Sequence, residues 1–173
     1  MVEISLSGIT SGNWLTYDSD FAQHVGEKLL LTIVEFEKFE AQASSLDIDF
    51  ALTLSSNVDV KILAPWLVRL KMVELIVENF TDGRVFTQAR VLRDMGFKGE
   101  IKVRGPMMPD QAKFFARVGV DTLIVADANR VDDFMSVLRR YNLFYQTSAD
   151  GYVPVFKLRH MKAAQISDQR KAS

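Results

Sequence analysis

The chain of 173 residues contains no cysteine. This absence excludes disulfides, thiolate nucleophiles, cysteine-ligated iron–sulfur clusters and thiolate zinc sites within the chain. Histidine is almost absent as well, since the sequence holds only His24 and His160, one near each end. A histidine-rich metal site and catalysis by imidazole are therefore not expected, and we predict no metal site.

The sequence also lacks a surplus of positive charge and long apolar runs. Its formal net charge is −1, whereas a general nucleic-acid binder carries a basic domain or stripe, so nucleic acid is not an expected partner. No apolar run approaches the roughly 18 residues that cross a bilayer. The first eight residues, MVEISLSG, lack the basic and apolar regions of a secretory signal. We therefore expect no membrane partner and a cytoplasmic location.

Two nucleotide-binding motifs are missing. The chain has neither the G-x-G-x-x-G dinucleotide fingerprint nor the G-x-x-x-x-G-K-[ST] phosphate loop. The two glycines of GFKGE, residues 96–100, precede an expected strand, where neither motif belongs. The cofactor is therefore unknown, and an oxidoreductase would need an unfamiliar cofactor site or would act through a partner.

What the sequence does contain is a repeated spacing of apolar runs. Apolar residues make up 48 % of the chain and charged residues 25 %, which suits one globular domain with a substantial core. Short runs rich in β-forming residues recur about every 21 to 27 residues, the pitch of a strand, a helix and two short loops. The runs are residues 29–34, 50–54, 73–77, 100–103, 122–125 and 143–146.

The segments between these runs have the periodicity of amphipathic helices. In one of them four apolar residues fall at steps of three and Gly96 follows as a stop. That stripe consists of Phe86, Ala89, Leu92 and Met95. In the next two segments, Pro109 suits a first helical turn and Asp127 is a natural N-cap.

Successive βα units predict an α/β fold with a mainly parallel sheet, either an open doubly wound sheet or a partial barrel. Runs that are apolar at successive positions favour strands covered on both faces. We predict a single domain over residues 1–160 and a polar, disordered tail over residues 161–173. Residues 145–158 predict a C-terminal β-hairpin around Ala149-Asp150-Gly151.

The candidate ligand site lies in the loops that follow two neighbouring strands, because ligands in such folds bind at the carboxyl ends of strands. In the first loop Gly83 permits positive φ, and Arg84 and Arg90 suit phosphate, sulfate or carboxylate. The alternative is that the Asp-Gly pair forms an ordinary turn and that the arginines are solvated. The candidate anion- or ligand-binding residues are Asp82, Gly83, Arg84, Thr87, Arg90, Arg104, Gly105, Asp110 and Gln111.

A catalytic role for this group needs an aspartate beside an arginine, which is at least as often a structural ion pair. The sequence therefore assigns no catalytic residue. It assigns no oligomeric state either.

The strongest motif is FTDGRVFTQARVLR at residues 80–93, followed by GFKGE and a glycine loop that ends in Asp110-Gln111. It resembles a bacterial family of uncharacterised proteins that are described as oxidoreductases of sulfite reduction, because their genes tend to lie beside that of the sulfite reductase haemoprotein. The strong resemblance covers about residues 74–125 and a weaker one residues 29–146. The matching residues are Phe80, Asp82, Gly83, Arg84, Thr87, Ala89, Arg90, Leu92, Arg93, Gly96, Phe97, Gly99, Glu100, Gly105, Asp110, Gln111 and Gly119.

The sequence departs from the family pattern at two places. Residues 102–111, KVRGPMMPDQ, stand where many relatives have RAVGDVLRDQ, and Val118 replaces a cysteine. The resemblance implies an oxidoreductase or accessory protein of assimilatory sulfite reduction, with sulfite reductase as the partner. The alternative is a non-catalytic scaffold or assembly module that binds sulfite reductase.

Overall fold

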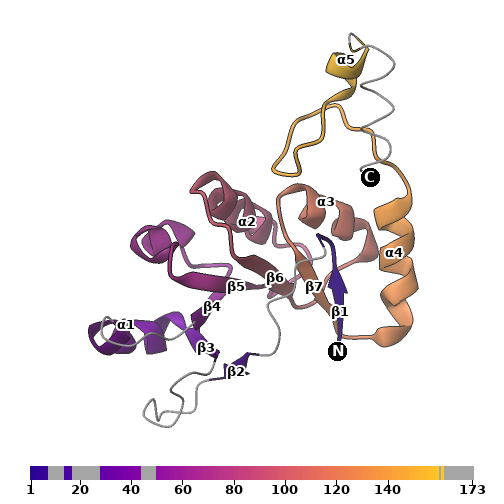
Figure 1. Ribbon diagram of the computed structural model, residues 1–173. Coiled ribbons are helices and arrows are strands. Elements are labelled where there is room, and N and C mark those ends of the chain that lie inside the picture. Colours follow the sequence, from indigo (N-terminus) through magenta and orange to yellow (C-terminus); the bar gives the residue numbers. More distant parts are fainter. Residues whose placement is uncertain (8–13, 17–27, 44–49, 160, 162–173) are drawn as a thin grey trace.

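One mixed sheet of seven strands organises the computed structural model, which describes residues 1–7, 14–16, 28–43, 50–159 and 161 (Figure 1). The strand order is β1-β7-β6-β5-β4-β3-β2; β1 runs antiparallel to β7 and every other pairing is parallel. The strands are β1 (Val2–Ser5), β2 (Leu15–Thr16), β3 (Leu29–Thr32), β4 (Phe50–Ser55), β5 (Leu70–Ile76), β6 (Glu100–Arg104) and β7 (Thr122–Val125). The first five predicted apolar runs are therefore strands.

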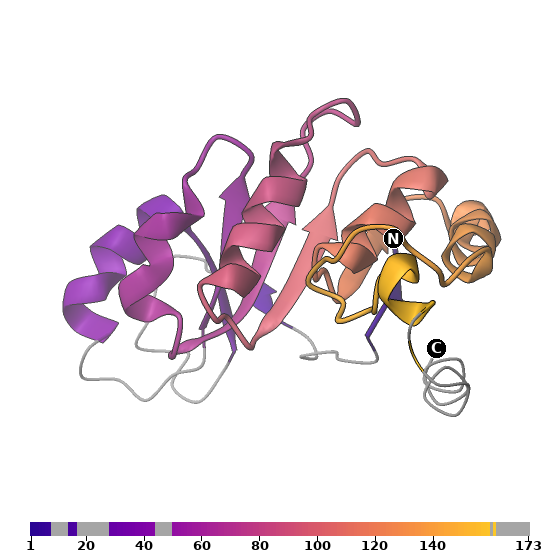
Figure 2. The same ribbon diagram turned by 90° about the horizontal axis from the view of Figure 1, so that it is seen from above.

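The sheet is a partial barrel, which is one of the two predicted alternatives. From β2 to β7 the order in the sheet follows the order in the chain and never reverses. Right-handed crossovers that always advance in one direction place every connecting helix on the same face. Figures 1 and 2 show α1, α2, α3 and α4 along the outer side of the curled sheet. A doubly wound sheet needs a reversal of strand order and helices on both faces.

The helices begin and end near the predicted positions. Pro109 opens a short 3₁₀ turn, and the Asp127 carboxylate caps another by accepting a hydrogen bond of 2.9 Å from the Asn129 amide. The helical elements are α1 (Ile33–Ala43), η2 (Val60–Trp66), α2 (Arg84–Asp94), η3 (Pro109–Gln111), α3 (Ala112–Arg117), η4 (Ala128–Arg130), α4 (Val131–Arg139) and α5 (Val155–Leu158). None of the helices in the described part of the chain is both long and apolar enough to cross a membrane.

The apolar core lies between the outer face of the sheet and the helices. Phe86 of α2 stacks on Phe115 of α3 with ring centroids 4.2 Å apart. Each large apolar side chain that is fully buried in this core contributes about 1.5–3 kcal/mol to stability. The strand residues of the core include Leu52, Leu54, Val73, Leu75, Ile101, Val103 and Leu123, and the helix residues include Val85, Ala89, Leu92, Ala112, Phe115 and Phe134.

The concave face of the sheet differs from the expectation that strands are covered on both faces. Along β6, Ile101 and Val103 belong to the core, and Glu100, Lys102 and Arg104 alternate with them on the concave side. No described helix packs on that side (Figure 1). The sheet is therefore apolar outside and carries charged side chains inside.

The predicted C-terminal hairpin is wrong. Residues 143–146 form no strand, and Val155 begins the short helix α5. Pro154 has no amide hydrogen to donate to a strand ladder. Phe144 is instead buried, with the Arg117 guanidinium 3.9 Å from its ring centroid, so the chain packs on α3. The predicted tail, apart from Met161, and both histidines lie outside the described residues.

Candidate functional site

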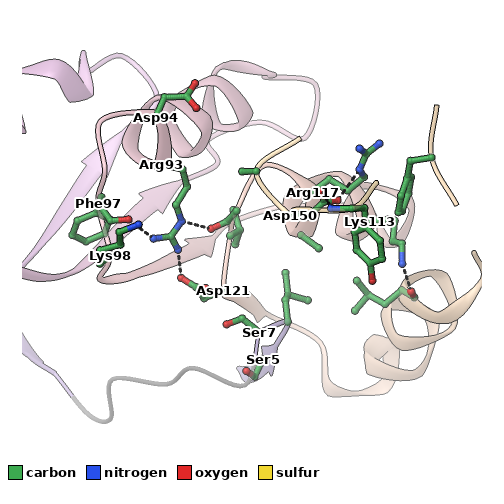
Figure 3. Close-up of a pocket in the computed structure, with 18 of the residues that line it drawn as sticks. Ser5, Ser7, Arg93, Asp94, Phe97, Lys98, Lys113, Arg117, Asp121 and Asp150 are labelled. Atoms are coloured by element: carbon green, nitrogen blue, oxygen red, sulfur yellow. Dashed lines mark hydrogen bonds and ion pairs between the residues drawn. The ribbon is translucent and has the colours of Figure 1, made fainter. Parts of the chain in front are cut away.

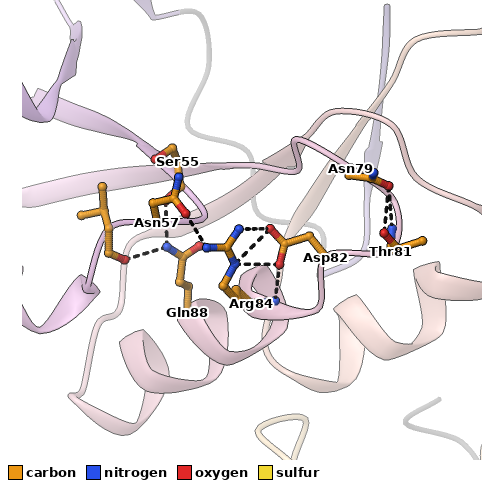
Figure 4. A network of polar contacts seen from close by, with 8 residues as sticks. Ser55, Asn57, Asn79, Thr81, Asp82, Arg84 and Gln88 are labelled. Carbon is orange, nitrogen blue, oxygen red and sulfur yellow. Dashed lines mark hydrogen bonds and ion pairs between the residues drawn. The ribbon is translucent and has the colours of Figure 1, made fainter.

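Asp82 and Arg84 form a brace at the start of α2 (Figure 4). Arg84 Nε donates to Asp82 Oδ1 at 2.9 Å and its Nη2 to Asp82 Oδ2 at 2.7 Å, a bidentate pair. The Arg84 amide also donates to Asp82 Oδ1 at 3.0 Å. Arg84 Nη1 reaches the side-chain oxygen of Asn57, so the brace joins the loops after β4 and β5.

The brace fixes the charge state of both partners. The hydrogen bonds from Arg84 hold the pKa of the Asp82 carboxyl well below its usual range, and Asp82 raises the pKa of Arg84. The loop after β5 therefore carries a neutral ion pair, and the Arg84 charge is already matched by a carboxylate of this chain.

Three other predicted residues of this loop and helix lie at the surface. Gly83 has φ −79°, so this position does not use the positive φ that glycine permits. Thr87 is exposed. Arg90 pairs with Asp94 one turn further along α2 at 2.9 Å, and both side chains are largely in water. Arg90 therefore fits the alternative in which the arginines of this segment are solvated.

The loop after β6 meets the loop after β5 through Gln111. Its side-chain nitrogen donates to the Phe80 carbonyl at 2.7 Å, and its side-chain oxygen accepts from the Met108 amide at 2.9 Å. Asp110 is exposed in η3. The structure thus brings the two loops together at one edge, as predicted for neighbouring parallel strands. Among the described residues, however, no hydrogen bond or ion pair joins the Asp82–Arg84 brace to Arg104.

Arg104 turns toward the concave face and pairs with Glu74 of β5. Its Nε lies 3.1 Å from Glu74 Oε1 and its Nη2 lies 3.2 Å from Oε2. Thr53 of β4 donates to the same carboxylate at 3.1 Å. The Glu74 side chain is 6 % exposed and that of Arg104 is 43 % exposed, so the pair presents its guanidinium side to water.

A buried lysine continues this polar arrangement. Lys102 Nζ lies 2.9 Å from Glu3 Oε1 and 3.9 Å from Glu100 Oε1, and Thr122 donates to Glu100 at 2.6 Å. In register, Thr53, Glu74, Lys102 and Thr122 lie side by side across four strands. We call these residues the concave polar row: Glu3, Thr53, Glu74, Glu100, Lys102, Arg104 and Thr122.

Of the concave polar row, the sequence predicted only Arg104 as a site residue. Buried charges need partners, and each charge of the row has one within the chain. The alternation of charged and apolar residues in EIKVR, residues 100–104, was the available signal. The charged residues of the row are held in ion pairs. Of its two basic side chains, Lys102 is buried and Arg104 is partly exposed to water.

A small apolar pocket of about 230 Å³ lies at the same edge, beyond the ends of β6 and β7. Met107, Val125 and Phe134 line it, and Arg130 contributes a charged side chain. No group of three or more acidic, histidine or cysteine residues that could hold a metal ion occurs in the described ranges.

At the opposite edge Arg93 is a structural clamp in the wall of a larger cavity, of about 810 Å³ (Figure 3). Arg93 donates to the carbonyls of Phe97, Gly99 and Gly119 at 2.8 to 2.9 Å and also binds the Asp121 carboxylate. These bonds join the end of α2 to the starts of β6 and β7. A Cβ atom on Gly99 would lie 2.5 Å from the Lys71 carbonyl oxygen, and Gly119 adopts φ +96°. Arg93, Gly99 and Gly119 therefore each have a structural reason to stand in the family motif.

The geometry defines a class of protein, an α/β half-barrel whose strand ends are cross-braced by ion pairs. Residues 51–156 match the model of the family described as "bacterial protein of unknown function (DUF934)", so the chain belongs to that family. The match begins in β4 and ends in α5, so it contains every residue of the predicted ligand site. A search of curated proteins gives no match to the chain.

Proposed function

We propose that the protein is a non-catalytic accessory protein of assimilatory sulfite reduction that binds sulfite reductase. The pathway rests on the resemblance carried by residues 80–111. The non-catalytic role rests on one observation: Arg84, Arg90 and Arg104 are each paired with a carboxylate of this chain. An anionic substrate would have to compete with those carboxylates for the charge of each arginine.

The three pairs resist displacement to different degrees. The Arg90–Asp94 pair is exposed, and such pairs contribute only about 0.2–1 kcal/mol. A lone guanidinium on a helix surface is nevertheless a weak anion site, because water and salt screen its charge. Arg104 is held by a nearly buried Glu74 that Thr53 also contacts. Breaking that pair would leave a buried carboxylate without its counter-charge, which is costly.

The test is direct binding between this protein and the sulfite reductase haemoprotein of the same bacterium. Both are purified and mixed at physiological salt, and the complex is measured by interferometry and size-exclusion chromatography. We expect a stable complex, and addition of this protein to change the assembly or yield of active reductase. Absence of a complex at every protein concentration up to about 100 μM would reject the proposal.

A second candidate function is binding and turnover of a sulfur oxyanion at the strand ends. The observation that favours it is Arg104, whose side chain is 43 % exposed at the carboxyl end of β6. In this reading Glu74 occupies the anion position in the absence of substrate.

Glu74→Gln distinguishes the two candidates. The amide keeps the shape of the side chain and can still accept from Thr53, but it removes the charge that neutralises Arg104. If Arg104 is the anion site, calorimetry with sulfite and sulfate should show tighter binding to Glu74→Gln than to the wild type. Asp94→Asn is the matched control, because it frees Arg90 on the surface of α2. The accessory role predicts no saturable heat in any of the three proteins.

A further inference from the structure

The C-terminal arm, residues 139–159, displays an unusual number of exposed apolar side chains. Tyr145 is 77 % exposed, Phe156 54 %, Leu143 52 % and Tyr141 43 %. Single exposed apolar residues are normal on a protein surface, whereas several within one short segment mark an interaction site. Figure 1 shows the arm rising from the end of α4, with α5 at its tip.

The arm is held firmly even though its apolar residues are exposed. Arg117 of α3 binds the Asp150 carboxylate at 2.9 Å and stacks on the buried ring of Phe144. The Ala149 amide donates to the Arg117 carbonyl at 3.0 Å, and the Val155 amide donates to the Phe144 carbonyl at 2.8 Å. A partner would thus meet an ordered surface, and little conformational entropy would be lost on binding.

The charge of this region is opposite to that of the rest of the chain. Residues 139–159 contain four basic residues and one acidic residue, a net charge of +3. The whole chain has a net charge of −1, so the remaining residues carry −4. The four basic side chains are exposed, and none is in an ion pair with a described residue; they are Arg139, Arg140, Lys157 and Arg159.

We propose that the C-terminal arm is the docking surface for an acidic protein partner. Tyr145 and Phe156 are the apolar anchors, and the four exposed basic residues of the same segment select a negatively charged surface. Tyrosine and arginine are enriched at the centres of protein interfaces. This inference goes beyond the proposed function, because it depends on the chemistry of the partner and not on the pathway.

Site-specific cross-linking in the whole protein tests the inference. A benzophenone amino acid replaces Tyr145 or Phe156 in living bacteria, and replaces Val68, which is 94 % exposed on the body, as the control. We expect cross-links from the two arm positions, but not from position 68, to one protein with an acidic surface. That protein is then purified and its affinity for this chain measured at several salt concentrations.

Charge reversal gives the deciding measurement. The double variant Arg139→Glu, Arg140→Glu should weaken binding of the purified partner at least tenfold and should abolish the cross-link. The matched control is Lys61→Glu, Lys98→Glu, which changes the net charge equally at exposed positions outside the arm. It should bind with an affinity within about threefold of the wild type.

Several results would overturn the inference. In the cross-linking experiment, these are loss of the cross-links after ribonuclease treatment, cross-links only between copies of this chain, or equal cross-link yields from position 68. In the binding experiment, it is an affinity that charge reversal does not change. The two proposals also fail separately. An acidic partner cross-linked at the arm, with no reductase complex up to about 100 μM, supports the arm and rejects the proposed function. A reductase complex without arm cross-links does the reverse.

Discussion

At the scale of single residues, Gly105 has the most demanding position. It adopts φ +134°, and a Cβ atom there would lie 2.1 Å from the Val77 carbonyl oxygen. We expect Gly105→Ala to lower the free energy of unfolding by at least about 2 kcal/mol, because the new methyl group clashes with backbone and the dihedral is strained. Urea denaturation followed by circular dichroism measures the change.

Gly83→Ala is the matched control for this substitution. Gly83 has φ −79°, and a Cβ atom there would meet nothing within 4 Å, so alanine should change stability by less than about 0.5 kcal/mol. Equal losses in the two variants would contradict the steric argument. The comparison also separates two glycines of the family motif, of which only Gly105 requires its lack of a side chain.

The residue types of the site and the local Asp82–Arg84 pair could be predicted from the sequence, but the long-range partners could not. Arg84 and Arg104 were both predicted as candidate anion ligands, and their pairing with carboxylates was only an alternative. Glu74 lies 30 residues before Arg104, and Asn57 lies 27 residues before Arg84. Such contacts depend on strand register, which local patterns do not specify. The contacts of Arg93 could not be predicted either, because its acceptors are the carbonyls of three loop residues.

At the scale of elements, the start of α2 depends on the ionised form of Asp82. The pKa of Asp82 is lowered in the folded protein, chiefly by its hydrogen bonds to Arg84. A lowered pKa adds stability that is complete above the unfolded pKa of about 3.9 and is lost as the pH falls through the folded pKa. The stability advantage of wild type over Asp82→Asn should therefore be full above about pH 5 and shrink below about pH 4.

Denaturation series between about pH 2.5 and pH 7 measure this difference. Asparagine can still accept a hydrogen bond from the Arg84 amide, so the variant isolates the loss of charge. Asp110→Asn is the control, because Asp110 is exposed in the equivalent loop of the next βα unit. A difference for Asp82→Asn that does not depend on pH would exclude the charge as its cause.

Elements were predictable where local patterns agreed with tertiary packing. The apolar runs of β4 to β7 and the cap at Asp127 depend on neighbouring residues, and they were predicted correctly. Residues 145–158 have β-forming residues around an Asp-Gly pair, which is a hairpin pattern. Packing of Phe144 against Arg117, together with Pro154, overrides that pattern. All but one residue of the concave polar row were missed because their burial arises from the curl of the whole sheet.

At the scale of the whole molecule, the centre of the sheet should be its most stable part. β5 and β6 have a parallel neighbour on each side, whereas β1 and β2 lie at the two edges. Backbone amides in β5 and β6 should exchange with deuterium slowest, at rates that approach global unfolding, and those in β2 fastest. Exchange followed by mass spectrometry or NMR checks this order. Protection of β1 equal to that of β6 would contradict it.

The position of β1 has a consequence for the way the sheet is made. Val2–Ser5 leave the ribosome before the other six strands, yet their neighbour in the sheet is β7, about 120 residues later. β3 to β7 can each be added to the strand made just before, so most of the sheet can assemble in the order of synthesis. Of the seven strands, β1 is therefore made first but can pair only after β7 has been synthesised. The ion pair between Lys102 and Glu3 of β1 cannot form before that point. The first strand to be synthesised thus completes the sheet.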